Sequence, residues 1–285
     1  MRNRVWLAPL TMASLICWLG CSSQQRHPPS AGDIGADASA EDGGGSVVPV
    51  VDAAACAGKA VEVHVNTADG LVLEATWSDP CAMGAKRAIV LSHQLCSTKA
   101  EWSASDSDWV SALGTKGIAT LALDLRGHGG STHFPDGSMH DLCKETDANA
   151  AALMGEASKD VAAGIAWVKQ QGATKVGVVG ASIGGNASLV VLGADTTIHV
   201  AVALSPGADY FGIKPAAALM QAGSRPIALV AADDDPSSAA DVRAFAQSDA
   251  ALMTKIWPTG GHANAIIRAH PEELTRLAAL VAGAL

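Results

Sequence analysis

The chain has 285 residues, of which 49% are hydrophobic and 16% are charged, and its formal net charge is −9 at pH 7. This length and apolar content suffice for one large folded domain with a sizeable core. The acidic balance, with no basic stripe and no aromatic RNA-binding motif, argues against a nucleic-acid-binding protein.

Residues 1–20 have the features of an export signal. Arg2 and Arg4 form a positive n-region, and the apolar run 5–19 is too short to cross a bilayer as a stable helix. The run ends in Trp-Leu-Gly-Cys at positions 18–21, which resembles a bacterial lipobox, although Trp18 stands where an aliphatic residue is usual. We therefore expect lipidation at Cys21 and an exported lipoprotein anchored to a membrane, in the bacterial outer membrane or periplasm. An ordinary secretory signal cleaved nearby is the alternative.

Residues 21–57 consist mostly of Ser, Ala, Gly, Asp and Pro and contain few large apolar side chains. Such a segment cannot bury enough surface to offset the entropy of ordering it. We expect it to be a flexible tether. The folded domain then occupies residues 58–285.

The folded part opens with a predicted β-hairpin, in which residues 60–66 and 71–77 flank an Ala-Asp-Gly turn. Short apolar runs follow, of the kind found in strands buried on both faces of a parallel sheet. Helical patterns lie between these runs. Their alternation predicts an α/β fold with eight strands in a mostly parallel sheet and helices on both faces. The predicted later strands are 87–91, 118–123, 175–179, 200–204, 227–231 and 252–257, and the predicted helices are 101–113, 158–170, 184–192, 237–249 and 271–281.

A Gly-Ala-Ser-Ile-Gly sequence at 180–184 lies between a predicted strand and a predicted helix. A G-x-S-x-G in that context is the nucleophile elbow of a serine hydrolase. Its serine sits in a strained backbone, and any side chain at Gly180 or Gly184 would crowd the packing of the helix against the strand. Ser182 is therefore the candidate nucleophile.

An activated serine needs a base, and the base needs a carboxylate that orients it. Asp235 follows the seventh predicted strand and His262 follows the last, so both lie at carboxyl ends of strands, where open α/β sheets place their sites. We assign the base to His262 and the acid to Asp235. Asp234 and Asp209 remain alternatives for the acid, whereas Asp233 belongs to an acidic turn and is expected to be solvated.

Four motifs in order resemble those of α/β-hydrolase fold serine hydrolases, and the layout resembles the compact dienelactone-hydrolase-like enzymes. The motifs are Ser-His-Gln-Leu at 92–95, Asp-Leu-Arg-Gly-His-Gly-Gly-Ser at 124–131, the elbow, and the Gly-Gly-His that ends at 262. The resemblance implies an oxyanion hole made by the backbone N–H groups of Ile183 and Leu95, and no cofactor. Gln94 stands where the family usually has Gly, and Ser182 replaces the cysteine of dienelactone hydrolases proper.

The expected activity is hydrolysis of a carboxylic ester or a related acyl bond in a small substrate, through an acyl-enzyme. Only about 20 residues separate the sixth and seventh predicted strands, so we expect no cap domain and an open site. A peptidase or acyltransferase of the same fold is one alternative. A catalytically silent, ligand-binding surface lipoprotein is another, and the oligomeric state stays open.

The cysteines outside the signal region predict two disulfides, as expected in an oxidising compartment. Hairpin geometry pairs Cys56 with Cys81, and the carboxyl edge of the sheet pairs Cys96 with Cys143. Zinc is the competing interpretation, but no C-x-x-C spacing supports it. No metal site is expected: the acids and histidines of the loop after the fourth strand lack ligand spacing, and two further histidines are expected to be structural. These residues are His133, Asp136, His140 and Asp141 in the loop, and His93 and His128.

Overall fold

The computed structural model describes residues 60–80, 86–145, 148–249 and 251–285. The predicted export signal (1–20), the tether (21–57), the lipidation site at Cys21 and the Cys56–Cys81 pair lie outside these ranges. Within them, no helix combines the length and the apolar character that crossing a membrane requires.

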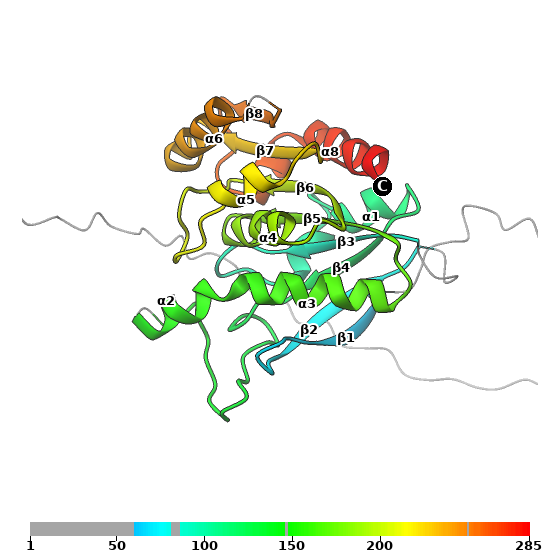
Figure 1. Ribbon diagram of the computed structural model, residues 1–285, viewed down its shortest axis with the longest axis vertical. Coiled ribbons are helices and arrows are strands. Elements are labelled where there is room, and N and C mark those ends of the chain that lie inside the picture. Colours follow the sequence, from blue (N-terminus) through cyan, green and yellow to red (C-terminus); the bar gives the residue numbers. More distant parts are fainter. Residues whose placement is uncertain (1–59, 81–85, 146–147, 250) are drawn as a thin grey trace, which may run out of the picture. The chain divides into compact units, whose positions relative to one another are not determined.

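Eight strands form one sheet in the order β1-β2-β4-β3-β5-β6-β7-β8 (Figure 1). Strand β2 is antiparallel to both β1 and β4, and all other neighbouring pairs are parallel. The predicted eight-stranded, mostly parallel sheet is confirmed. The strands are β1 (Val61–Asn66), β2 (Val72–Ser78), β3 (Arg87–Ser92), β4 (Ala119–Leu123), β5 (Lys175–Ala181), β6 (Ile198–Leu204), β7 (Ile227–Ala232) and β8 (Met253–Trp257).

The central strands are apolar throughout because each of their faces meets a layer of helices. In β3, Ala88 and Val90 belong to one core cluster, and Ile89 and Leu91 belong to the other. Successive side chains of a strand point to opposite faces, so a strand covered on both sides needs an apolar residue at every position. This requirement explains the continuous apolar runs in the sequence.

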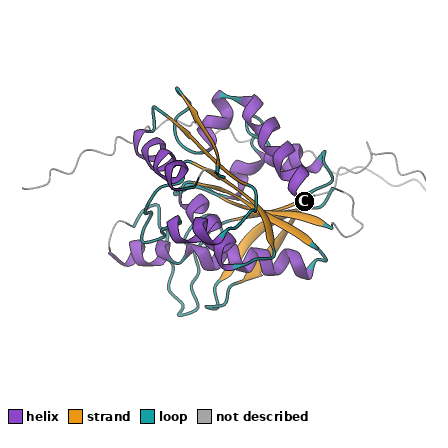
Figure 2. Cartoon of the chain, turned by 45° about the horizontal axis from the view of Figure 1, so that its top comes forward, coloured by secondary structure: helices purple, strands orange, loops and turns teal. Residues whose placement is uncertain are grey.

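Helices cover both faces of the sheet (Figure 2). Helices α3, α4, α5 and α6 contribute to one core cluster, and α1, α7 and α8 contribute to the other. The helical elements are η2 (Lys99–Ser103, a 3₁₀ turn), α1 (Trp109–Gly114), α2 (Ala148–Gly155), α3 (Ala157–Gln170), α4 (Ile183–Ala194), α5 (Ala216–Gln221), α6 (Pro236–Ser248), α7 (Asn264–Ala269) and α8 (Pro271–Ala284).

The single helix predicted over 101–113 is wrong, because the chain breaks it into η2 and α1. Ala104 has extended backbone angles and ends η2. The side chain of Asp108 then accepts a hydrogen bond of 2.8 Å from the N–H of Ser111 and caps a new helix. Trp102 and Trp109, one from each piece, are fully buried and meet edge to face at 6.0 Å against the sheet. Trp102 therefore packs this segment against the sheet.

A buried ion pair fixes the loop that follows β4. The Arg126 guanidinium is 2% exposed and lies 2.7 Å from the fully buried carboxylate of Asp160 in α3. It also lies 3.0 Å from Asp69 in the β1–β2 turn. Burial raises the pKa of Asp160 to about 6, and the hydrogen bonds and charge of Arg126 oppose that shift. The loop is thereby tied to the hairpin and to α3.

Candidate active site

Ser182 lies at the sharp turn between β5 and α4. Its backbone has a φ of 52°, a strained conformation for a residue with a side chain. The N–H of Ser182 donates to the carbonyl of Leu204 at the end of β6 (2.7 Å), which holds the turn in place. A Cβ on Gly184 would lie 2.6 Å from the His93 carbonyl oxygen and closer still to that of Ser92. The glycines of the motif therefore allow α4 to contact β3, as the sequence predicts.

His262 is joined to Asp235 by a hydrogen bond of 2.7 Å between Nδ1 and Oδ2. Asp235 follows β7 and its side chain is 13% exposed, whereas the ring of His262 is 41% exposed. Burial raises the pKa of the Asp235 carboxyl, but the hydrogen bond from His262 and those from two serine hydroxyls outweigh it and hold that pKa below its usual range. The carboxylate is thus ionised and oriented toward the imidazole.

The other candidate acids have different partners. Asp234 accepts hydrogen bonds from the N–H groups of Gly260 (3.0 Å) and Gly261 (2.9 Å), so it shapes the turn that precedes the histidine. Asp209 accepts from the N–H of Gly212 (2.7 Å) and lies 3.3 Å from a lysine ammonium. Asp233 forms an exposed ion pair with an arginine. Among the candidates, the geometry therefore places only Asp235 against the imidazole of His262.

A group of hydroxyls behind Asp235 was not predicted from the sequence. The two serine hydroxyls that bond its carboxylate belong to Ser205 and Ser238, both fully buried. The Tyr210 hydroxyl lies 3.1 Å from Ser238 Oγ and donates to the carbonyl of Ser205 at 3.4 Å. Tyr210 is the only tyrosine of the chain and lies in the short connection between β6 and β7, a sequence signal that does not by itself indicate a role.

Ile183 and Leu95, whose backbone N–H groups are the predicted oxyanion donors, lie beside the candidate nucleophile. Ile183 begins α4 directly after the nucleophile, and Leu95 lies in the loop after β3; both line the same pocket as Ser182. Within the described ranges, neither N–H donates to a protein acceptor. Both N–H groups are therefore available to a ligand, and a developing oxyanion requires such donors.

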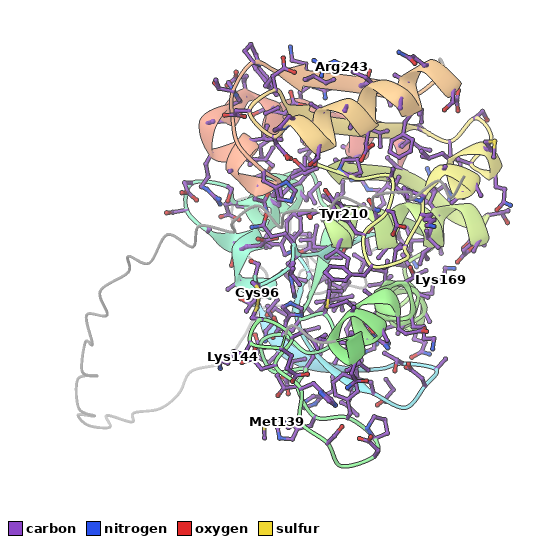
Figure 3. The ribbon with its side chains drawn as sticks, turned by 90° about the vertical axis from the view of Figure 1, so that its left-hand side faces the viewer. Cys96, Met139, Lys144, Lys169, Tyr210 and Arg243 are labelled. Carbon is purple, nitrogen blue, oxygen red and sulfur yellow. A yellow bond between two sulfur atoms is a disulfide. The ribbon has the colours of Figure 1, made fainter. Side chains whose placement is uncertain are left out.

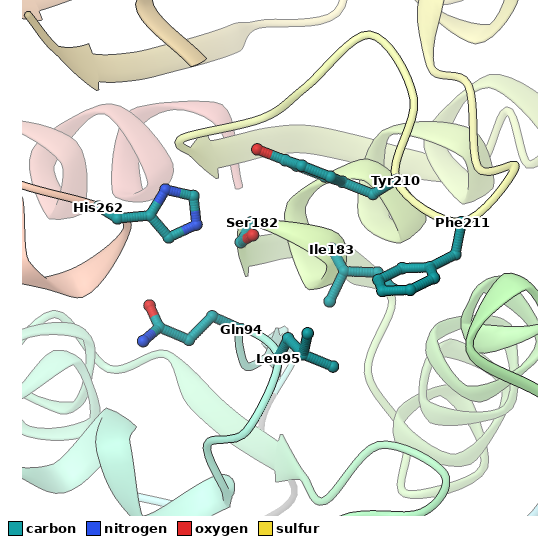
Figure 4. Close-up of a pocket in the computed structure, with 7 residues that line it drawn as sticks. All are labelled: Gln94, Leu95, Ser182, Ile183, Tyr210, Phe211 and His262. Atoms are coloured by element: carbon teal, nitrogen blue, oxygen red, sulfur yellow. The ribbon is translucent and has the colours of Figure 1, made fainter. Parts of the chain in front are cut away.

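The pocket around Ser182 has a volume of about 380 Å³. Figure 4 shows Tyr210 above Ser182, Gln94 below the ring of His262, and the apolar side chains of Leu95, Ile183 and Phe211 together on the opposite side. The connection between β6 and β7, which is fully described, holds the short helix α5 and no inserted domain. This connection therefore carries no cap domain, as predicted.

The structure contains the predicted Cys96–Cys143 disulfide, with 5.0 Å between the two Cα atoms. Cys96 directly follows Leu95, so the bridge ties the loop after β3, called the oxyanion segment below (residues 93–96), to the loop after β4. Cys96 and Tyr210 are both seen when the molecule is viewed from the left-hand side of Figure 1 (Figure 3). Ligand atoms of Cys96, His128 and Cys143 lie within 4.8 Å of one another, but the two sulfurs are bonded to each other and are not thiolates in this state.

The remaining histidines near the site have structural positions. His93 is fully buried; its Nδ1 lies 2.7 Å from the Gln94 carbonyl and its Nε2 accepts from the N–H of Leu125 at 3.0 Å. Burial lowers the pKa of His93 to about 3, so the ring is neutral. His128 is also buried and bonds the carbonyl of Arg126. The loop residues behave similarly: His140 pairs with Glu145, and the carboxylates of Asp136 and Asp141 bond Ser138 and Lys144, while His133 forms a β-bridge to Met139.

The chain matches the model of the alpha/beta hydrolase family over residues 89–278. Comparison with curated proteins gave no match. Among solved structures, it is similar to an esterase from Pyrococcus furiosus (18% identity, TM-score 0.61, covering 84% of this chain and 96% of that one). It is also similar to a dienelactone hydrolase from Anabaena variabilis (20% identity, TM-score 0.61, 80% and 97%) and to the esterase domain of a Rhodothermus marinus protein (13%, 0.56, 79% and 97%). The sheet order, the elbow and the family match agree, and the chain belongs to the alpha/beta hydrolase family.

Proposed function

We propose that the protein is a serine hydrolase that cleaves carboxylic esters, or related acyl bonds, through an acyl-enzyme. The observation that carries the proposal is the convergence of Ser182, on its strained turn, with His262 in one pocket, while His262 is bonded to Asp235 from behind. A purely ligand-binding protein has no need for a carboxylate behind the histidine or for two free N–H groups beside the serine.

The geometry supports a two-step reaction. Ser182 Oγ attacks the substrate carbonyl carbon while Nε2 of His262 takes the hydroxyl proton. Asp235 accepts the hydrogen bond from Nδ1 and stabilises the imidazolium. The N–H groups of Ile183 and Leu95 bind the oxyanion, and loss of one such donor typically costs ~10²–10³ in rate. His262 then returns the proton to the leaving oxygen, and the same groups activate water to hydrolyse the acyl-enzyme.

Substitution of each candidate acid by asparagine tests this assignment. In assays with p-nitrophenyl butyrate, Asp235→Asn should lower kcat by about 10²–10⁴, because the neutral amide no longer stabilises the imidazolium and its NH2 group holds the imidazole in the wrong tautomer. Asp234→Asn and Asp209→Asn are matched controls that keep a carbonyl oxygen as an acceptor, and they should stay within a few-fold of the wild type. A loss of activity confined to Asp209→Asn would contradict the role of Asp235.

The proposal includes export and lipid anchoring at Cys21, supported by the n-region, the apolar run and the Leu-Gly-Cys at 19–21. In a bacterial host, the full chain should fractionate with membranes and yield a lipid-modified peptide that begins at residue 21. Cys21→Ser should abolish that modification. An unmodified N-terminus from the wild-type chain, cleaved elsewhere, would instead indicate an ordinary secretory signal.

A further inference from the structure

The pocket has two chemically different sides. Leu95, Ile183 and Phe211 form its apolar side, and two of these side chains are unusually accessible: Leu95 is 36% exposed and Phe211 is 43% exposed. Gln94 and Tyr210 lie instead next to the catalytic pair, on either side of Ser182 (Figure 4). A substrate bound across the serine would therefore meet apolar groups at one end and polar groups at the other.

The reaction geometry fixes which end meets the polar groups. The carbonyl oxygen must point to the N–H groups of Ile183 and Leu95. The leaving oxygen must lie near Nε2 of His262, because that nitrogen protonates it. The carboxamide of Gln94 points toward the ring of His262 (Figure 4). The leaving group therefore occupies the end of the pocket that Gln94 lines.

The side chain of Gln94 offers a hydrogen-bond acceptor at this end of the pocket. Gln94 Oε1 is buried and has no hydrogen-bond partner among the described residues. A buried acceptor without a donor costs free energy, and a ligand that supplies the donor recovers it.

We propose that Gln94 Oε1 accepts a hydrogen bond from a hydroxyl group carried by the leaving alcohol, so that the preferred substrates are esters of diols or polyols. This inference rests on the proposed ester hydrolysis. It makes Gln94, at the position where the family usually has glycine, the residue that determines leaving-group specificity.

Two pairs of butyrate esters test the proposal on the full chain. The 2-hydroxyethyl and propyl esters differ only in a hydroxyl that replaces a methyl, and the 2-methoxyethyl and butyl esters form the same contrast without a donor. We expect kcat/KM to favour the hydroxyethyl ester by about 2- to 10-fold, the effect of one neutral hydrogen bond. The methoxyethyl ester should have no advantage over the butyl ester.

Substitutions at Gln94 distinguish a specific hydrogen bond to its side chain from an effect of the general polarity of the pocket. In Gln94→Met, which keeps the length of the side chain, the ratio should fall below one, because an unpaired hydroxyl is costly to bury. Gln94→Glu retains the acceptor and should retain the preference for the hydroxyl. Gln171→Met, at an exposed position after α3, should leave the ratio at its wild-type value.

The possible failures are distinguishable. If the wild type hydrolyses none of these esters, the proposed function itself is wrong. If it hydrolyses the hydroxyethyl and propyl esters equally well, or if Gln94→Met keeps the preference, ester hydrolysis stands and the Gln94 subsite is refuted. A butyrate ester of 2-acetamidoethanol serves as a further arm: a preference for this amide ester with none for the hydroxyl would overturn the choice of a hydroxyl over an amide N–H.

Discussion

Replacement of Gly184 by alanine tests how the nucleophile turn is built. The new Cβ would lie 2.6 Å from the His93 carbonyl oxygen and closer to the Ser92 carbonyl, whereas real Cβ atoms essentially never approach within 3.0 Å. All of these neighbours are backbone atoms, so no side chain can turn away to make room. Helix α4 would have to move away from the end of β3 by roughly 1 Å.

The cost follows from this displacement. Overpacking of a well-packed core costs typically 1–3 kcal/mol. We expect about 3 kcal/mol here, because Ser92 and His93 are completely buried and because the 2.9 Å hydrogen bond from Ser92 Oγ to the Gly184 carbonyl would also be disturbed. For a domain of this size, that loss lowers Tm by about 6–12 °C. Activity should fall further, by about 10²-fold, since β3 leads directly to the oxyanion segment.

Thermal unfolding and p-nitrophenyl butyrate hydrolysis, measured on the same samples, check this prediction. The matched control is Gly283→Ala in α8, where an added Cβ meets nothing within 4 Å. That variant should be as active as the wild type and equally or slightly more stable, because alanine favours a helix over glycine. The argument fails if Gly184→Ala and Gly283→Ala have the same Tm and activity.

Three further changes have expected outcomes. Asp160→Asn should lower the unfolding free energy by about 3–5 kcal/mol in urea titrations, because it leaves the buried Arg126 guanidinium without its main partner. Asp69→Asn should lower it by less, because the Asp69 carboxylate is 32% exposed. Equal losses in the two variants would contradict this ranking. Cys96→Ser combined with Cys143→Ser should cost about 2–4 kcal/mol and also lower kcat by releasing the oxyanion segment; unchanged kcat would show that the segment needs no tether. Hydrolysis of p-nitrophenyl esters should slow from butyrate to palmitate because the pocket of about 380 Å³ cannot enclose a long chain, and a rise with chain length would refute this.

The sheet could be predicted from the sequence because strands buried on both faces are continuous apolar runs. The predicted run 227–231 corresponds to β7, Ile227–Ala232, and 252–257 corresponds to β8, Met253–Trp257. The prediction of one helix over 101–113 failed because the apolar spacing of this segment continues across the break between η2 and α1. The chain ends η2 at Ala104 and begins again at the Asp108 cap, and both tryptophans still reach the core.

The sequence predicts those site residues whose backbone position is fixed by a motif. It does not predict those whose position depends on tertiary packing. The turn at Ser182 and the position of His262 follow from their strands. The sequence favoured Asp235 among the three adjacent aspartates after β7 but did not exclude Asp234, because the choice depends on one tight turn that directs Asp234 to backbone N–H groups and Asp235 to the imidazole. Tyr210 reaches the pocket through a contact with α6, and no local pattern encodes that contact.

Labelling with a fluorophosphonate probe tests the central claim most directly. Such a probe reacts with a serine only when a base activates it. The wild-type chain should acquire one adduct, which peptide mapping should place on Ser182. Ser182→Ala should show neither labelling nor ester hydrolysis while keeping the wild-type Tm. An adduct on another residue, or full ester hydrolysis by Ser182→Ala, would contradict the account.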